Sequence, residues 1–247
     1  MKKIYSFLAG IAAIILVLWG IATHLDSKIN SRDSQKLVIY NWGDYIDPEL
    51  LTQFTEETGI QVQYETFDSN EAMYTKIKQG GTTYDIAIPS EYMINKMKDE
   101  DLLVPLDYSK IEGIENIGPE FLNQSFSGEA SQMLEKNENL RYVVPTEASN
   151  LWFDNMVIPK TVKNQNSAYA FINFMLKPEN ALQNAEYVGY STPNLPAKKL
   201  LPEETKEDKA FYPDVETMKH LEVYEKFDHK WTGKYSDLFL QFKMYRK

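Results

Sequence analysis

The spacing of apolar residues beyond residue 36 predicts alternating strands and helices. "KLVIYNW" (36–42) and "YDIAIPS" (84–90) are short apolar runs typical of buried strands, and "IQVQYETF" (60–67) alternates like a half-buried strand. Segments 48–58 and 70–79 between them carry apolar residues at helical spacing. Because strand and helix alternate through short links, we expect right-handed crossovers and a doubly wound parallel sheet of the α/β class.

Polar residues in front of the predicted helices mark where each helix begins. Asp47, followed by a proline, is expected to cap the first helix. Asp68 and Glu71 have the spacing of a capping box and predict the start of the second helix. Ser90 is expected to cap a third helix over 91–103.

The ends of two predicted strands carry aromatic and polar side chains. In doubly wound sheets, ligands bind in the crevice beyond the carboxyl ends of the strands. Taken singly, each side chain there is explained equally well by a turn or by core packing. Their clustering favours a pocket for a cation. The residues at these two strand ends are Trp42, Gly43, Asp44, Tyr45, Ser90 and Tyr92.

A second candidate constellation lies in "NLWFDNMVIP" (150–159). In an extended strand, Trp152 and Asp154 point to the same face. A carboxylate beside an indole suits an alkylammonium group, although a core tryptophan beside a surface aspartate is the structural alternative. Two helices follow, with a break at Pro178, and a turn after Gly189 displays Tyr190.

The N-terminal segment predicts a membrane location. The uncharged apolar run Ile4–Ala22 is long enough to span a bilayer as a helix. Lys2 and Lys3 precede it and should stay inside, so the rest of the chain is expected outside the cytoplasm. The run is longer than a signal-peptide core, which favours a retained anchor over cleavage after Ala22.

Composition excludes several classes of function. With 26 basic and 36 acidic residues, the formal net charge of -10 argues against a nucleic-acid partner. The chain has no cysteine, which excludes disulfides, thiolate metal sites, a cysteine nucleophile and a lipid anchor on cysteine. Its three histidines lack the spacing of a metal site or a catalytic triad. We therefore expect no enzyme, no catalytic residue, no metal and no cofactor.

Several motifs resemble one family. "YNWGDYI", "FTEETGIQVQYETFDSNEAMYTKIK", "YDIAIPS", "LWFDNMVIP" and "GYSTPN" are similar to segments of the spermidine/putrescine-binding proteins of polyamine ABC transporters. The resemblance implies a type II periplasmic-binding-protein fold, a polyamine clamped between two lobes and a permease partner. It implies polyamine contacts for Trp42, Gly43, Asp44, Tyr45, Ser90, Tyr92, Trp152, Asp154 and Tyr190, and for Tyr224, which stands where relatives can have Gln.

The chain departs from the family pattern in "EFLNQSFSGEASQML" (120–134). Phe126 runs directly into Ser127, Gly128 and Glu129, where the family has most of a second lobe. The second lobe is therefore expected to be largely missing, with the acidic residues that hold one end of the polyamine. Phe126 and Glu129 are further candidate contacts beside this junction.

The expected organisation follows from this departure. Residues 1–35 form the anchor or signal segment with its tether, and 36–126 with 150–197 form the first α/β lobe. Residues 127–149 and 198–247 are the remnant of the second lobe and the C-terminal helices. The predicted function is extracytoplasmic polyamine capture for an ABC transporter, impaired by the shortening, at the periplasm or the outer face of the bacterial cytoplasmic membrane. The alternative is a membrane-tethered interaction module that no longer binds ligand.

Overall fold

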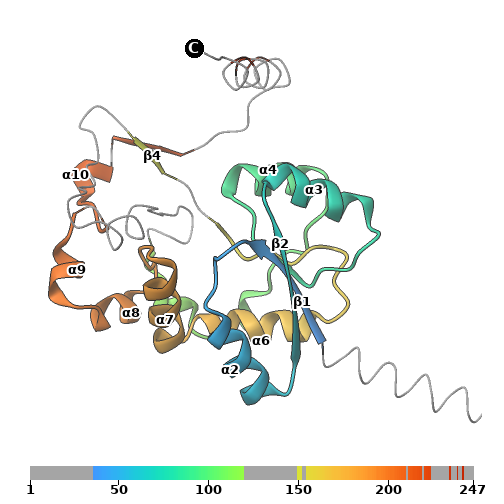
Figure 1. The fold of residues 1–247 in the computed structure, drawn as a ribbon, viewed down its shortest axis with the longest axis horizontal. Coiled ribbons are helices and arrows are strands. Elements are labelled where there is room, and N and C mark those ends of the chain that lie inside the picture. The colour runs from blue at the N-terminus through green and yellow to red at the C-terminus, as the bar shows by residue number, and fades with distance from the viewer. Residues whose placement is uncertain are drawn as a thin grey trace, which may run out of the picture.

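A parallel three-stranded sheet forms the centre of the protein. The computed structural model describes residues 36–119, 149–151, 154–209, 211–218 and 220–223, with the single positions 234, 238 and 241. The strands are β1 (Lys36–Trp42), β2 (Gln61–Phe67) and β3 (Ile86–Ala87), in the order β2-β1-β3. Both pairings are parallel, as the strand and helix pattern predicted (Figure 1).

A returning segment lies antiparallel beside β3. Val157 and Ala87 exchange backbone hydrogen bonds of 2.9 and 3.0 Å, and a further antiparallel bridge joins Ser90 to Asp154. This pairing brings Asp154 to the carboxyl end of β3, although more than sixty residues separate it from Ser90 in the chain. The segment therefore carries Asp154 to the carboxyl ends of the strands, where the sequence predicted a crevice.

Helix α2 (Pro48–Thr58) begins and ends as predicted. The Asp47 side chain accepts a hydrogen bond of 2.9 Å from the Glu49 backbone N–H, and Pro48 occupies the first turn. Gly59 ends the helix with φ at 73°, a left-handed conformation that glycine adopts without steric cost. Local sequence was sufficient to predict this element.

Helix α3 (Asn70–Gln79) corrects the predicted capping box. Its cap is Ser69, whose hydroxyl accepts from the Ala72 backbone N–H at 3.2 Å, and not Asp68. Ser69 is extended, with φ at -156°, and the helix begins at Asn70. The predicted helix range 70–79 is therefore confirmed, and only the predicted cap residue is wrong.

Helix α4 (Glu91–Asp99) also differs from its prediction. Ser90 stands at the cap position, but its hydroxyl makes no capping bond because it donates to the carboxylate of Asp154. The helix stops before 103, since Asp101 is left-handed with φ at 57° and the chain turns there to run beside the returning segment.

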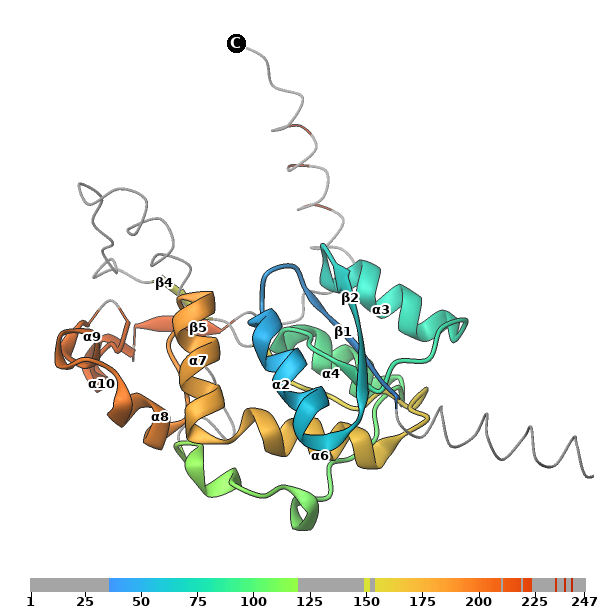
Figure 2. The ribbon, with the colours of Figure 1, turned by 60° about the horizontal axis from the view of Figure 1, so that its bottom comes forward.

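Two further helices follow the returning segment, and the first of them covers the sheet. Helices α6 (Gln165–Met175) and α7 (Pro178–Val188) are separated by a break at Lys177 and closed by left-handed Gly189, as expected. Helices α2 and α6 lie on one face of the sheet, and α3 and α4 lie on the other (Figures 1 and 2). The doubly wound prediction is confirmed.

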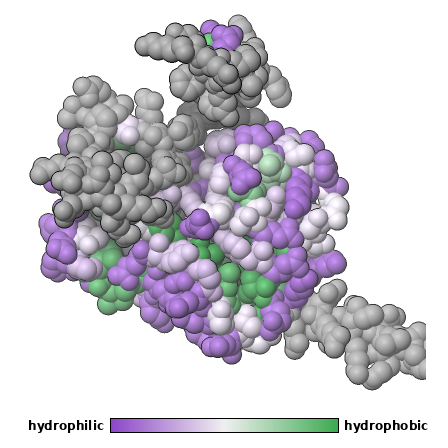
Figure 3. Space-filling model, in the orientation of Figure 1, coloured by the Kyte–Doolittle hydropathy of each residue, from purple (hydrophilic) through white to green (hydrophobic). Residues whose placement is uncertain are grey.

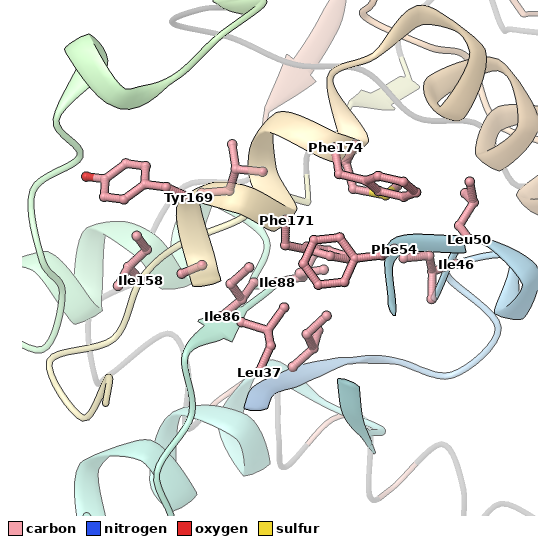
Figure 4. Close-up of a cluster of buried hydrophobic side chains, with 14 of the residues drawn as sticks. Leu37, Ile46, Leu50, Phe54, Ile86, Ile88, Ile158, Tyr169, Phe171 and Phe174 are labelled. Atoms are coloured by element: carbon pink, nitrogen blue, oxygen red, sulfur yellow. The ribbon is translucent and has the colours of Figure 1, made fainter. Parts of the chain in front are cut away.

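The main core lies between the sheet, α2 and α6. Phe54 and Phe171 are fully buried and meet edge to face, with ring centroids 5.2 Å apart, above Leu37 and Ile86 of the sheet (Figure 4). Fully burying a side chain of this size contributes about 1.5–3 kcal/mol. A second cluster, which includes Met73, packs under α3 and α4 on the other face.

The remaining elements lie beside α7, on the side away from the sheet, or follow α4. They are the 3-10 helices η1 (Tyr108–Lys110) and η2 (Ile114–Asn116), the helices α8 (Leu195–Leu200), α9 (Glu203–Glu207) and α10 (Val215–Met218), and the paired parallel strands β4 (Ser149–Leu151) and β5 (Leu221–Val223) (Figure 2). No helix in the described ranges is both long and apolar enough to cross a membrane. The predicted span Ile4–Ala22 lies outside those ranges, and the division into lobes stays a prediction.

Candidate functional site

The carboxylate of Asp154 is the centre of the candidate site. Tyr45, in the loop after β1, donates its phenol proton to Asp154 Oδ2 at 2.7 Å. Ser90, after β3, donates its hydroxyl proton to Asp154 Oδ1 at 2.7 Å. Three residues that the sequence pattern selected from three separate segments are thus in direct contact. Tyr45 and Ser90 lie together because parallel strands β1 and β3 end at one edge of the sheet, and the antiparallel returning segment brings Asp154 to that edge.

Asn70 supports this cluster from the first turn of α3, and sequence reasoning missed it. Its side chain is buried, accepts from the Ser90 backbone N–H at 3.1 Å, and donates to Ser90 Oγ at 3.1 Å and to the Tyr92 hydroxyl at 3.0 Å. A backbone N–H can only donate, so the amide oxygen must face it and the amide nitrogen must face the Ser90 hydroxyl. Asn70 therefore orients the Ser90 proton toward Asp154.

Aromatic rings line the cluster on the side of β1. The rings of Tyr45 and Tyr190 meet edge to face with centroids 5.3 Å apart, and Trp42 lies 6.3 Å from Tyr45. Tyr190 reaches this position because left-handed Gly189 ends α7 and turns the chain back. The Trp42 ring also packs on the ring of Phe67, with centroids 4.5 Å apart. Trp42 therefore contacts both the buried core and the site.

Side chains from α7 fix the position of this turn relative to α2. Gln183 donates to Asp47 Oδ2 at 2.8 Å, and the Asp47 backbone N–H donates to Asn184 Oδ1 at 3.0 Å. The residue that caps α2 therefore also holds α7. This pairing sets the distance between Tyr45, which precedes the cap, and Tyr190, which follows the end of α7.

Gly43 and Asp44 lie in an exposed turn. Asp44 has φ at 52°, in the left-handed region that aspartate tolerates better than most residues. Within the described part of the chain it joins neither the hydrogen bonds of Asp154 nor those of Asn70. A side chain at Gly43 would meet no atom within 4 Å, so its turn is open to solvent.

Tyr45 and Tyr92 keep their phenol protons. Burial raises the pKa of Tyr45, and the neighbouring negative charge of Asp154 raises it further. Burial, with the charge of Glu71, raises the pKa of Tyr92 to about 12. A hydroxyl that stays protonated donates to a carboxylate at every physiological pH. Neutral Tyr45 therefore donates to Asp154, and neutral Tyr92 donates to Glu71 at 3.3 Å.

A cavity of about 420 Å³ opens beside Asp154, between the end of β1, α6 and α7. Its wall is mainly apolar, with polar groups from the loops that follow β1 and α7. On the face drawn in Figure 3, hydrophobic residues reach the surface in separate patches among hydrophilic ones. The cavity is lined by Asn41, Tyr45, Ile46, Ile88, Leu106, Tyr108, Ile111, Ile114, Ile117, Asp154, Asn155, Met156, Ile172, Met175, Leu176, Ala181, Asn184, Ala185, Val188, Tyr190, Ser191, Thr192, Pro193 and Asn194.

Four candidate contacts lie outside the described residues, namely Phe126, Glu129, Trp152 and Tyr224. The shared face predicted for Trp152 and Asp154 stays a prediction for the same reason. Within the described ranges, no three metal-ligating side chains are grouped closely enough to hold an ion.

Comparison with family models identifies two matching segments. Residues 122–213 match the family model for bacterial extracellular solute-binding proteins. Residues 2–118 match a family of hypothetical lipoproteins. The 247-residue sequence contains no cysteine.

Solved structures and curated proteins give closer relatives. The spermidine/putrescine ABC transporter substrate-binding protein PotD from Streptococcus pneumoniae shares 65% identity at a TM-score of 0.77, over 86% of this chain and 99% of that chain. A spermidine/putrescine ABC transporter candidate from Listeria monocytogenes shares 40% identity at a TM-score of 0.79, over 86% of this chain and 100% of its own. These neighbours have the type II periplasmic-binding-protein fold.

The spermidine/putrescine-binding periplasmic protein of Escherichia coli is 29% identical over 323 aligned positions, which include 86% of this chain and 91% of the relative. The alignment is longer than the 247 residues of the chain. The relative therefore contains stretches that this chain lacks, as expected for a protein with a shortened second lobe.

Proposed function

Because this chain belongs to the family of substrate-binding proteins of polyamine ABC transporters, we propose that it captures putrescine or spermidine outside the cytoplasm. The observation that carries the proposal is the Asp154 carboxylate, which accepts hydrogen bonds of 2.7 Å from the hydroxyl groups of Tyr45 and Ser90. The ring of Tyr45 in turn contacts the ring of Tyr190. Trp42, Tyr92 and the exposed pair Gly43 and Asp44 are proposed contacts at the same sheet edge.

The chemistry of the site matches a primary ammonium group. An ammonium ion has three N–H donors and no acceptor, and a carboxylate has two oxygens with about four acceptor positions. Hydrogen bonds between such ions are roughly twice as strong as neutral ones. The rings of Tyr45 and Tyr190 offer faces for the cation and apolar cover for the adjacent methylenes.

The proposal includes weakened binding. By resemblance to the family, the shortened region contained the acidic residues that hold the other end of a polyamine. Hydrogen bonds to charged groups contribute roughly 1.5–3 kcal/mol each, so the loss of two carboxylates removes about 3–6 kcal/mol. This corresponds to a loss in affinity of roughly a hundredfold to ten-thousandfold. Closure of two lobes over the ligand is lost as well.

A second candidate function rests on the same shortening. The alignment with the Escherichia coli relative is longer than the chain, so part of the ligand-binding protein is absent. A chain that keeps one lobe can retain a surface for a membrane permease or another exported protein without binding ligand. Under this alternative the molecule is a membrane-tethered interaction module.

Isothermal titration of the full chain with spermidine separates the two functions. The proposal predicts weak but measurable binding, which Asp154→Asn reduces about tenfold to a hundredfold. Asp101→Asn is the matched control, because it removes the same charge from a side chain that is 86% exposed and does not line the cavity. Absence of binding by the native chain would favour the interaction module. Binding in the low micromolar range or tighter would contradict the predicted impairment.

A further inference from the structure

The cavity beside Asp154 has an uneven distribution of polarity. Asp154 is the only charged side chain among the described residues that line it. The other described lining residues are uncharged: most are apolar, such as Ile88, Ile172 and Met175, and neutral polar side chains stand among them. The cavity thus has one anionic group and an otherwise uncharged, mainly apolar wall.

Its size falls within the range of small-molecule sites. Ligand pockets usually measure about 300–1,000 Å³ and are lined mainly by apolar side chains with a few placed polar groups. The volume here is about 420 Å³. A chain of five to seven non-hydrogen atoms is therefore readily accommodated, with one end at the carboxylate.

A diamine and a monoamine differ in what they bring to this interior. Once one ammonium contacts Asp154, the second ammonium of a diamine must either enter an apolar region that offers no second carboxylate or bend back toward solvent. Burial of an unpaired charge is strongly unfavourable, whereas burial of a methyl group in the same place is favourable. The wall therefore discriminates against a second charge.

We propose that the ligand class best suited to this cavity is a primary alkylammonium ion with an apolar tail, bound with its ammonium group at Asp154 and its tail against α6 and α7. The inference rests on the proposed function for the contact between ammonium and carboxylate. It adds that this chain prefers one terminal charge over two. The wall adds to the weakening of polyamine capture that the lost carboxylates and lost closure cause.

Hexylamine and 1,5-diaminopentane provide a matched pair of probes. Both are linear, both have seven non-hydrogen atoms, and they differ by a methyl group in place of the second ammonium. Titration of each into the full chain at pH 7 should give hexylamine an affinity at least about tenfold higher. Asp154→Asn, titrated under the same conditions, is the control for binding of either amine that does not involve this carboxylate.

A charge placed inside the cavity should reverse the preference. Ala181 of α7 lines the cavity and is half-buried, so Ala181→Asp adds a second carboxylate to the wall. This variant should bind 1,5-diaminopentane more tightly than hexylamine. Asn166→Asp, on the exposed side of the first turn of α6, adds the same charge outside the cavity and should keep the native order.

The outcomes are distinct. Tighter binding of hexylamine by the native chain supports the inference. Equal or tighter binding of 1,5-diaminopentane would overturn it and leave the proposed function standing. Failure of both amines and of spermidine to bind would overturn the inference together with the proposed function. The native comparison decides the matter even if Ala181→Asp does not fold.

Discussion

The phenol of Tyr45 donates a hydrogen bond of 2.7 Å to the carboxylate of Asp154, across 109 positions of sequence. The first residue follows β1 and the second lies in the segment that returns beside β3. The bond therefore joins two segments far apart in the sequence at the carboxyl ends of the strands, where ligands bind in doubly wound sheets. Removal of either group should lower ligand affinity more than it lowers the free energy of unfolding.

Tyr45→Phe removes the hydroxyl and keeps the ring. The Asp154 carboxylate then loses the hydrogen bond from Tyr45 and keeps the one from Ser90, so its orientation toward an ammonium group is less fixed. Spermidine affinity should fall roughly fivefold to tenfold. Tyr187→Phe, which removes a hydroxyl from a side chain that is 45% exposed, should leave affinity unchanged. Equal affinities for Tyr45→Phe and the native chain would mean that this hydrogen bond has no role in binding.

Asn70 is predicted to act as a positioning residue. Asn70→Ala removes the donor that orients the Ser90 hydroxyl, and it leaves the Ser90 backbone N–H without its acceptor. The free energy of unfolding should fall by about 1–3 kcal/mol, and spermidine affinity should also fall. A purely structural role would lower stability alone.

A double-mutant cycle with Ser90→Ala separates the two effects of Asn70. If Asn70 acts on the ligand through Ser90, the losses in affinity for Asn70→Ala and Ser90→Ala should not add, because the second substitution removes a group already misplaced by the first. Additive losses would indicate that Asn70 influences the ligand by another route.

Ser69 and Asp68 test the start of α3. Ser69→Ala removes the side chain that caps the helix and should lower the free energy of unfolding by about 1 kcal/mol. Asp68→Ala alters an exposed side chain in front of the cap and should have little effect. Urea unfolding of both variants measures the difference. A larger loss for Asp68→Ala would restore the capping box that the sequence suggested.

Because the pKa of Tyr45 is raised, the free energy of unfolding should decline at alkaline pH. Burial and the Asp154 charge raise this pKa in the folded state above the usual value of about 10. The unfolded chain releases the phenol proton first, so the stabilisation is complete below about pH 10 and declines as pH rises beyond it. Tyr45→Phe cannot lose that proton and should show a smaller decline between pH 9 and pH 11 in urea unfolding. Parallel declines for both proteins would contradict the assignment.

Local features of the fold were predictable, and tertiary ones were less so. Asp47 and Gly59 mark the ends of α2 through interactions within a few residues, which a sequence pattern records. Asn70 acts on Ser90 across two elements, and its sequence position resembles that of any polar residue in a first helical turn. The same distance explains why the predicted capping bond of Ser90 is absent: its hydroxyl donates to Asp154, a residue far away in the sequence.

The candidate site shows the same division. The sequence selected Tyr45, Ser90 and Asp154, and the structure brings all three together. It did not predict the antiparallel pairing that puts Asp154 beside Ser90, because strand partners distant in sequence depend on the whole fold. The pattern of residue types also did not predict the left-handed backbone of Asp44, whose side chain lies in an exposed turn.

Thermal unfolding of the full chain with and without millimolar spermidine tests the central claim most directly. A ligand at a hundred times its dissociation constant adds about 2.7 kcal/mol to the stability of the native state. We predict a higher unfolding temperature for the native chain and for Asp101→Asn, and a much smaller shift for Asp154→Asn. A cooperative transition that spermidine leaves unmoved in all three proteins would contradict ammonium recognition at Asp154.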